Sequence, residues 1–248
     1  EEQRVRTIVG RHGHKPVPRA IALTTVLGVL FLTFLDTTIV TVVLGNIQFT
    51  LGAGIIPLQW VVNAYSLVFA SLMLFAGSLG DRLGRKRLML IGIAVFCAGS
   101  VLCALSPSIG WLIGGRAVMG VGAAASEPGT LSVIRHMYPD RRRRARALGA
   151  WAAVSGLSLA IGPVIGGLLV AVGDWRTVFW FNLAFGAALF VFAAEFVPLS
   201  RDPQRGPLDG GGVVLGALAL GSLIFAGMSG EQYGYPTSWV IVLFVVGA

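Results

Sequence analysis

The sequence predicts an all-α polytopic membrane protein. Hydrophobic residues make up 55% of the 248 residues and charged residues only 12%, and the mean hydropathy is +0.80. Soluble proteins carry about 25% charged residues. A soluble fold has no surface for so many apolar side chains, whereas lipid solvates them. The charges are gathered in short segments between long apolar runs, as expected for loops between membrane-spanning helices.

Seven apolar runs reach the length of about 20 residues that a helix needs to cross a bilayer. We expect these spans at 20–47, 58–79, 88–106, 109–134, 147–171, 177–197 and 210–229. An eighth run begins at Trp239 and stops at Ala248, so we expect it to be truncated. The predicted organisation is a basic tail over 1–19, a six-span bundle over 20–198, a linker over 199–209, and an additional span with the start of the next over 210–248.

The basic residues predict how these spans are oriented. All but two of the 19 lysines and arginines fall in residues 1–19, 80–87, 135–146 and 198–209, which the predicted spans place on one side of the membrane. Because cytoplasmic loops are enriched in Lys and Arg, we expect a cytoplasmic N-terminus. The pI near 10.5 is in the range of proteins that bind nucleic acid. Confinement of the charge to these segments argues against such a partner.

Three ionisable residues lie well inside predicted spans, namely Asp36, Arg116 and Glu127. Such residues are costly in a bilayer and usually functional. With a rise of about 1.5 Å per residue, Asp36 and Arg116 reach similar depths in the outer half of the membrane. Glu127 follows Arg116 by close to three helical turns, so both project from one helix face. These positions favour a proton- or cation-responsive path, with structural ion pairs between helices as the alternative.

A segment with three glycines and five charges joins the second and third spans. Its key residues are Gly77, Gly80, Asp81, Arg82, Gly84, Arg85, Lys86 and Arg87. We expect the glycines to permit a tight turn, because glycine adopts backbone conformations that other residues avoid. We expect Asp81 to cap the third helix, since a carboxylate accepts hydrogen bonds from free N–H groups at a helix start.

The fifth span carries small residues at every fourth position. Ser158, Gly162 and Gly166 form one smooth face, with Pro163 and Gly167 beside it. Such a face allows two membrane helices to approach closely, and the proline bends the helix.

Nothing in the sequence indicates an enzyme. Cys97 and Cys103 lie in one apolar run and are expected to be free thiols, and the three histidines form no ligand cluster. No nucleophile–base pair is evident. We therefore expect no catalytic residues, no metal and no cofactor.

Together these segments resemble the major facilitator superfamily, specifically its fourteen-span drug/proton antiporter branch. Residues 35–40, Leu-Asp-Thr-Thr-Ile-Val, resemble the first-span motif of the branch, and residues 77–87 resemble the loop motif of the superfamily. Arg116 with the glycines that follow it resembles the fourth-span motif, and residues 158–167 resemble the fifth-span motif of antiporters. Residues 174–182 resemble the entry to the sixth span.

The resemblance implies a major-facilitator-type six-helix bundle of inverted three-helix repeats, followed by the seventh span and the truncated eighth. It implies that Asp36, Arg116 and Glu127 serve proton coupling and the substrate cavity, that 77–87 forms the cytoplasmic gate, and that 158–167 is the antiporter motif. A second bundle, absent here, would complete the transporter. The implied activity is export of lipophilic, cationic compounds across the bacterial inner membrane in exchange for protons.

The sequence also departs from the branch. Thr41 and Gly45 stand where the branch more often has Asn and Pro, Ser158 replaces a Gly, and Glu127 adds a charge at an often apolar position. Glu127 beside Pro128 would favour cationic substrates. Two alternatives of the same fold are a symporter, against which the fifth-span glycines argue, and an exporter of one metabolite. A non-transporting membrane sensor or assembly subunit is the alternative from another class.

Overall fold

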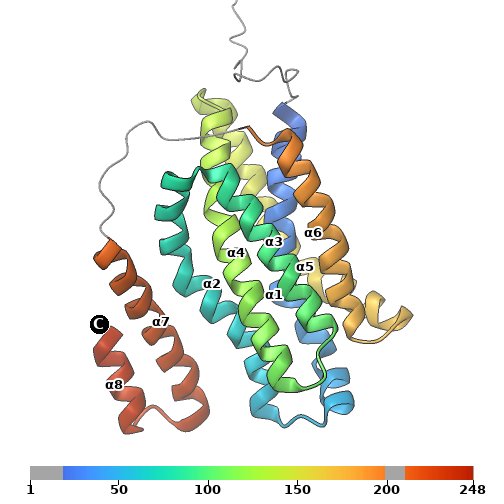
Figure 1. Ribbon diagram of the computed structural model, residues 1–248, viewed down its shortest axis with the longest axis vertical. Coiled ribbons are helices and arrows are strands. Elements are labelled where there is room, and N and C mark those ends of the chain that lie inside the picture. The colour runs from blue at the N-terminus through green and yellow to red at the C-terminus, as the bar shows by residue number, and fades with distance from the viewer. Residues whose placement is uncertain (1–18, 199–209, 248) are drawn as a thin grey trace, which may run out of the picture.

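The structure, a computed structural model, describes residues 19–198 and 210–247 (Figure 1). Within these ranges it consists of helices and loops, without strands. The helices are α1 (Arg19–Leu51), α2 (Ile55–Leu83), α3 (Arg85–Ala104), α4 (Ile109–Met137), α5 (Arg141–Val172), α6 (Arg176–Phe196), α7 (Gly210–Tyr233) and α8 (Ser238–Gly247). Seven of them are long and apolar enough to cross a membrane, which confirms the predicted class. Most of the predicted tail and the whole linker lie outside the described residues.

Helices α1 to α6 form one bundle in which α4 lies between α2 and α3 (Figure 1). Helix α1 packs against α5, α6 and α4, and α3 packs against α6. Helix α7 lies along the outer side of α2, and α8 packs on α7. The largest apolar side chains that are fully buried lie on α1, α2, α3, α4 and α6, and Trp175 lies directly before α6. The buried charged residues Asp36, Arg116 and Glu127 lie within this core.

Glycines on α4 allow the close packing of this bundle. A Cβ atom on Gly92 of α3 would lie 2.6 Å from the carbonyl oxygen of Gly122. A Cβ atom on Gly120, on another side of α4, would lie 2.7 Å from the carbonyl oxygen of Tyr65 on α2. Both distances are shorter than real Cβ contacts. Helix α4 therefore packs in close backbone contact with both α2 and α3. This contact fixes the rotation of α4 about its axis and so the direction in which its buried side chains point.

The turn between the second and third spans is much shorter than predicted. Helix α2 continues to Leu83 and α3 begins at Arg85, so Gly84 alone joins them, with φ of 93°. The prediction that Asp81 caps α3 was wrong, because Asp81 lies inside the last turn of α2 and the N-cap position is Gly84. Asp81 instead pairs with Arg85, with 3.0 Å between Oδ1 and Nη2.

The start of α5 also differs from the predicted span. The helix begins at Arg141, six residues before the predicted position of 147. The side chain of Asp140 accepts a hydrogen bond from the backbone N–H of Arg143 at 2.8 Å, as an N-cap residue does. Arginine is a good helix former, so the basic run continues the helix beyond its apolar part.

Candidate proton-coupling site

Asp36 is completely buried at the centre of the bundle. The Oδ2 atom of its carboxylate forms an ion pair with Nη1 of Arg116 on α4, and Oδ1 accepts a hydrogen bond from Nδ2 of Asn182 on α6 at 2.6 Å. All three side chains are fully buried. The structure thus brings Asp36 and Arg116 together, as their similar predicted depth allowed, and adds Asn182, which the sequence indicated only as part of a motif.

Arg116 extends this cluster to α2. Its Nε atom donates to the carbonyl oxygen of Val61 at 2.9 Å, and its guanidinium carbon lies 4.5 Å from the ring centroid of Tyr65. A cation over an aromatic face is attracted by the negative charge density of the ring. The Nη2 atom is buried, and none of the described residues forms a hydrogen bond with it. One arginine therefore connects α1, α2 and α4, and the Asp36 carboxylate adds α6.

Glu127 lies on the same side of α4 as Arg116 but contacts a different part of α1. Its Oε2 atom lies 3.1 Å from Oγ1 of Thr33, one helical turn before Asp36, and Oε1 has no hydrogen-bond partner within the described part of the chain. The carboxyl group is buried, with 2% of the residue exposed. The prediction that Arg116 and Glu127 share one helix face is confirmed, since both point at α1. The carboxyl groups of Asp36 and Glu127 nevertheless have different hydrogen-bond partners.

Thr33 and Tyr65 connect the surroundings of these two carboxyl groups, and neither was predicted from the sequence. The Tyr65 hydroxyl donates to the carbonyl oxygen of Thr33 at 2.9 Å while the Tyr65 ring lies against Arg116. Both residues are buried. Of the four tyrosines of the sequence Tyr65 alone falls inside a predicted span, which was a usable signal, whereas nothing separates Thr33 from the other threonines of the first span.

Helix α5 contacts α1 through part of the predicted glycine face. Ser158, Gly162 and Gly166 are buried. A Cβ atom on Gly162 would collide with Thr38 of α1, and one on Gly166 would lie 2.9 Å from the carbonyl oxygen of Ile39. Pro163 and Gly167, on the other side of the helix, are exposed.

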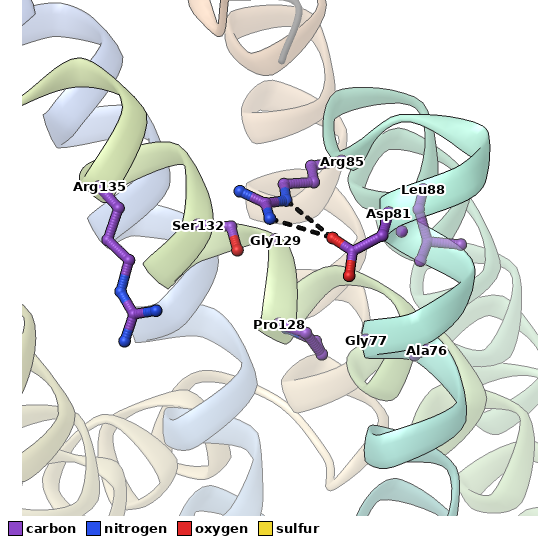
Figure 2. Close-up of a pocket in the computed structure, with 10 residues that line it drawn as sticks. Ala76, Gly77, Asp81, Arg85, Leu88, Pro128, Gly129, Ser132 and Arg135 are labelled. Carbon is purple, nitrogen blue, oxygen red and sulfur yellow. Dashed lines mark hydrogen bonds and ion pairs between the residues drawn. The ribbon is translucent and has the colours of Figure 1, made fainter. Parts of the chain in front are cut away.

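The 77–87 segment lines a cavity of about 270 Å³ at one end of the bundle. Figure 2 shows the Asp81–Arg85 pair on one side of this cavity and Arg135 of α4 on the other. The lining residues are Ala76, Gly77, Gly80, Asp81, Arg85, Leu88, Pro128, Gly129, Ser132 and Arg135. Lys86 instead donates to the carbonyl oxygen of Ala194 at the end of α6, at 2.7 Å. Arg82 and Arg87 are exposed.

Seven helices long and apolar enough to cross a membrane, with a buried ionic cluster inside the α1–α6 bundle, indicate a multi-pass membrane protein. The family model described as Major Facilitator Superfamily matches residues 26–248. The chain belongs to this superfamily, and the predicted family is confirmed.

Several curated relatives are named for drug resistance or efflux. The chain is 38% identical over 219 residues to "Multidrug resistance protein Stp" of Mycobacterium tuberculosis, covering 88% of this chain and 41% of the relative. It is 39% identical over 226 residues to "Methylenomycin A resistance protein" of Bacillus subtilis, covering 91% of this chain and 48% of the relative. The "Multidrug efflux pump LfrA" of Mycolicibacterium smegmatis is 39% identical over 188 residues, 76% of this chain and 37% of the relative.

Solved structures with the same fold are also transporters. A peptide transporter POT in complex with sulfate matches 96% of this chain and 50% of its own, with a TM-score of 0.67 and 18% identity. A bacterial homologue of the human lysosomal transporter Spinster, inward-facing and occupied, matches 94% and 58%, with a TM-score of 0.62 and 22% identity. At these identities the likeness concerns the fold. The chain spans less than half the length of the curated relatives described above.

Proposed function

We propose that the protein is a proton-coupled antiporter of the fourteen-span drug/proton branch, which exports lipophilic, cationic compounds across the bacterial inner membrane. The observation that carries this proposal is the buried contact of Asp36 with Arg116 and Asn182. Protonation of Asp36 removes the charge that holds this cluster together. Because the cluster joins α1, α2, α4 and α6, a single proton alters the packing of four helices, which is what coupling to alternating access requires.

The family and the charge distribution support the remaining parts of the proposal. Relatives named for multidrug resistance or efflux support export of drug-like compounds. We infer a cytoplasmic N-terminus, a six-span unit over 20–198, and a gate formed by 77–87 at the cytoplasmic end. In this unit Asp36, Arg116 and Glu127 serve proton coupling, and the face formed by Ser158, Gly162 and Gly166 serves the close contact of α5 with α1. A second bundle would complete the transport path.

Replacement of Asp36 tests the antiporter proposal. The protein, expressed as its gene encodes it, is reconstituted into liposomes with an acidic lumen, and uptake of the fluorescent lipophilic cation ethidium is followed. We expect wild-type uptake to depend on the pH gradient and Asp36→Asn to reduce it to background, because the amide cannot exchange a proton. Asp140→Asn is the matched control, since Asp140 is exposed and asparagine caps a helix equally well.

The possible results separate the alternatives. Wild-type uptake by Asp36→Asn would contradict the assignment of Asp36. Uptake driven only by an acidic exterior would indicate a symporter, and no transport of any tested compound would favour the sensor or assembly subunit.

A narrow-specificity exporter of the same fold is the second candidate. It is favoured by relatives named for resistance to one compound, methylenomycin A. A panel of lipophilic cations and neutral antibiotics in the same liposomes distinguishes the two. Transport of several unrelated cations supports the broad exporter, whereas transport of a single neutral compound supports the narrow one.

A further inference from the structure

The hydroxyl group of Thr33 has more acceptors around it than protons to give. Its Oγ1 atom lies 3.0 Å from the carbonyl oxygen of Leu30, 3.3 Å from that of Val29 and 3.1 Å from Oε2 of Glu127. Backbone carbonyls only accept hydrogen bonds, and a hydroxyl group donates one proton. If Glu127 were ionised, this one proton would face three acceptors, and unprotonated oxygen pairs would remain in contact.

A proton on Glu127 resolves this arrangement. The Oε2–H group then donates to Oγ1 of Thr33, and Thr33 donates its own proton to the carbonyl oxygen of Leu30. The surroundings favour the same assignment, because the ion pairs found among the described residues include none with Glu127, and its Oε1 atom lacks a donor. We infer that Glu127 carries a proton in this conformation and is a second proton-binding site, distinct from Asp36.

Asp36 provides the contrast within the same core. Its carboxylate accepts hydrogen bonds from the Arg116 guanidinium and from the Asn182 amide, which are partners of a charged form. An acid that meets only a hydroxyl group in a buried site is more stable neutral. In this conformation Asp36 on α1 is thus ionised, whereas Glu127 on α4 is protonated.

Few titratable groups surround Glu127. Asp36 on α1, Tyr65 on α2 and Arg116 on α4 belong to the neighbouring cluster, and the side chain that reaches α4 from α5 near this site is Trp151, whose Nε1 donates to Thr130 at 3.1 Å. On α3 the thiols are those of Cys97, which is half-buried, and Cys103, which is buried. The remaining charged residues of the helices packed on α4 lie toward helix ends, and they are Arg19, Asp81, Arg82, Arg85, Lys86, Arg87, Arg141, Arg142, Arg143, Arg144 and Arg146. On α4 itself Arg135 and His136 lie in the last turn, and on α6, which packs on α1 and α3, Arg176 and Glu195 also lie toward the helix ends.

The second site is connected to the first through Tyr65. The Tyr65 hydroxyl donates to the carbonyl oxygen of Thr33, and the Tyr65 ring contacts Arg116. When the proton leaves Glu127 for water, the Thr33 O–H turns from Leu30 to the new carboxylate. This rotation of the hydroxyl group takes place at Thr33, the residue whose backbone carbonyl oxygen accepts the hydrogen bond from Tyr65. This transfer step rests on the proposed function, whereas the protonation of Glu127 does not.

Infrared difference spectroscopy tests the assignment directly. Spectra of the protein, expressed as its gene encodes it, are recorded at neutral and alkaline pH, and a protonated carboxyl C=O band is identified by its shift in D₂O. We expect this band in the wild type and in Asp36→Asn, and its loss in Glu127→Gln. Glu195→Gln is the matched control, because Glu195 is exposed on α6, and it should keep the band. Absence of the band from the wild type, or its persistence in Glu127→Gln, would overturn the inference.

Two further readouts separate a proton site from a structural role. Thr33→Val should move the band to higher frequency, because the carboxyl O–H loses its acceptor, while Thr24→Val, at an exposed site on the same helix, should not. An unmoved band in Thr33→Val would contradict the proposed hydrogen bond. Glu127→Gln should exchange fewer protons per ethidium than the wild type. A wild type that shows the band but no pH-driven uptake would refute the antiporter proposal alone, and uptake without the band would refute this inference alone.

Discussion

At the scale of single residues, the Asp36 cluster is stable only while each of its members is present. Removing one partner of a buried ion pair costs about 3–5 kcal/mol, because the other charge stays buried without compensation. The Asp36 carboxylate is compensated by Arg116 on α4 and by the Asn182 amide on α6, and the Arg116 guanidinium also donates to the Val61 carbonyl oxygen on α2. A change in the charge of Asp36 is therefore transmitted to the helices themselves.

Loss of Asn182 should destabilise this cluster without removing a charge. In Asn182→Ala the Oδ1 atom of Asp36 loses its 2.6 Å hydrogen bond, and a hydrogen bond to a charged group contributes about 1.5–3 kcal/mol. We expect a lower thermal unfolding midpoint in detergent. Asn46→Ala, at an exposed position on α1, should leave the midpoint unchanged. Equal midpoints for the two variants would show that the Asn182 amide does not support Asp36.

The sequence revealed the ionic part of this site and missed its neutral part. Charges inside an apolar run stand out, so Asp36, Arg116 and Glu127 were predicted from position alone. Thr33 and Tyr65 carry no such contrast with their neighbours, and their role arises from the rotation of α1 and α2 against α4. That rotation depends on backbone contacts such as the one at Gly120, which hydropathy does not encode.

At the scale of elements, α1 links the candidate site to the glycine face of α5. Thr33 and Asp36 face α4 and α6, while Thr38 faces α5, where its hydroxyl group donates to the carbonyl oxygen of Leu159 at 3.1 Å. Gly162 leaves the space that Thr38 occupies. A displacement of α1 at Asp36 is therefore passed directly to α5.

Alanine at Gly162 should loosen this contact, and alanine at Gly167 should not. Both changes gain the same helix propensity, about 1 kcal/mol, so their difference isolates the packing against α1. A Cβ atom at Gly162 collides with Thr38, whereas no atom of the described residues lies within 4 Å of one at Gly167. Because overpacking costs about 1–3 kcal/mol, we expect Gly162→Ala to unfold at a lower temperature than Gly167→Ala. The reverse order in a thermal melt of the two purified proteins would contradict the α1–α5 packing.

The apolar runs predicted every membrane-length helix but placed several ends incorrectly. Hydropathy falls where a helix leaves lipid, whereas the backbone hydrogen bonds continue until a cap or a glycine ends them. Asp140 and Gly84 are such signals, and they set the true limits of α5 and of the α2–α3 turn. Hydropathy alone places the arginines of α5 in a loop, because polarity and helix formation are independent properties.

At the scale of the whole molecule, the two ends of the bundle differ in charge. One end carries the basic residues of the α2–α3 turn, of the end of α4 and of the start of α5. At the other end the described basic residue is Arg176, whose guanidinium is held by Asp174 at 3.2 Å and by the carbonyl oxygen of Ser106 at 3.0 Å. Because Lys and Arg are retained in the cytoplasm during insertion, this asymmetry favours a cytoplasmic location for the basic end.

Cysteine labelling in intact cells tests this orientation. In a background in which Cys97 and Cys103 are replaced by serine, one new cysteine is introduced at Gly110 or at Arg142, which are exposed at opposite ends of the bundle. A Cβ atom at Gly110 meets open space, so the substitution should be tolerated. A membrane-impermeant maleimide should label Gly110→Cys in intact cells and Arg142→Cys only after permeabilisation. The reverse pattern would place the basic end outside the cell. It would also remove the basis for treating the Asp81–Arg85 cavity as a cytoplasmic gate, because the cavity is lined by residues at the end of α2, the start of α3 and the end of α4, which belong to that same end.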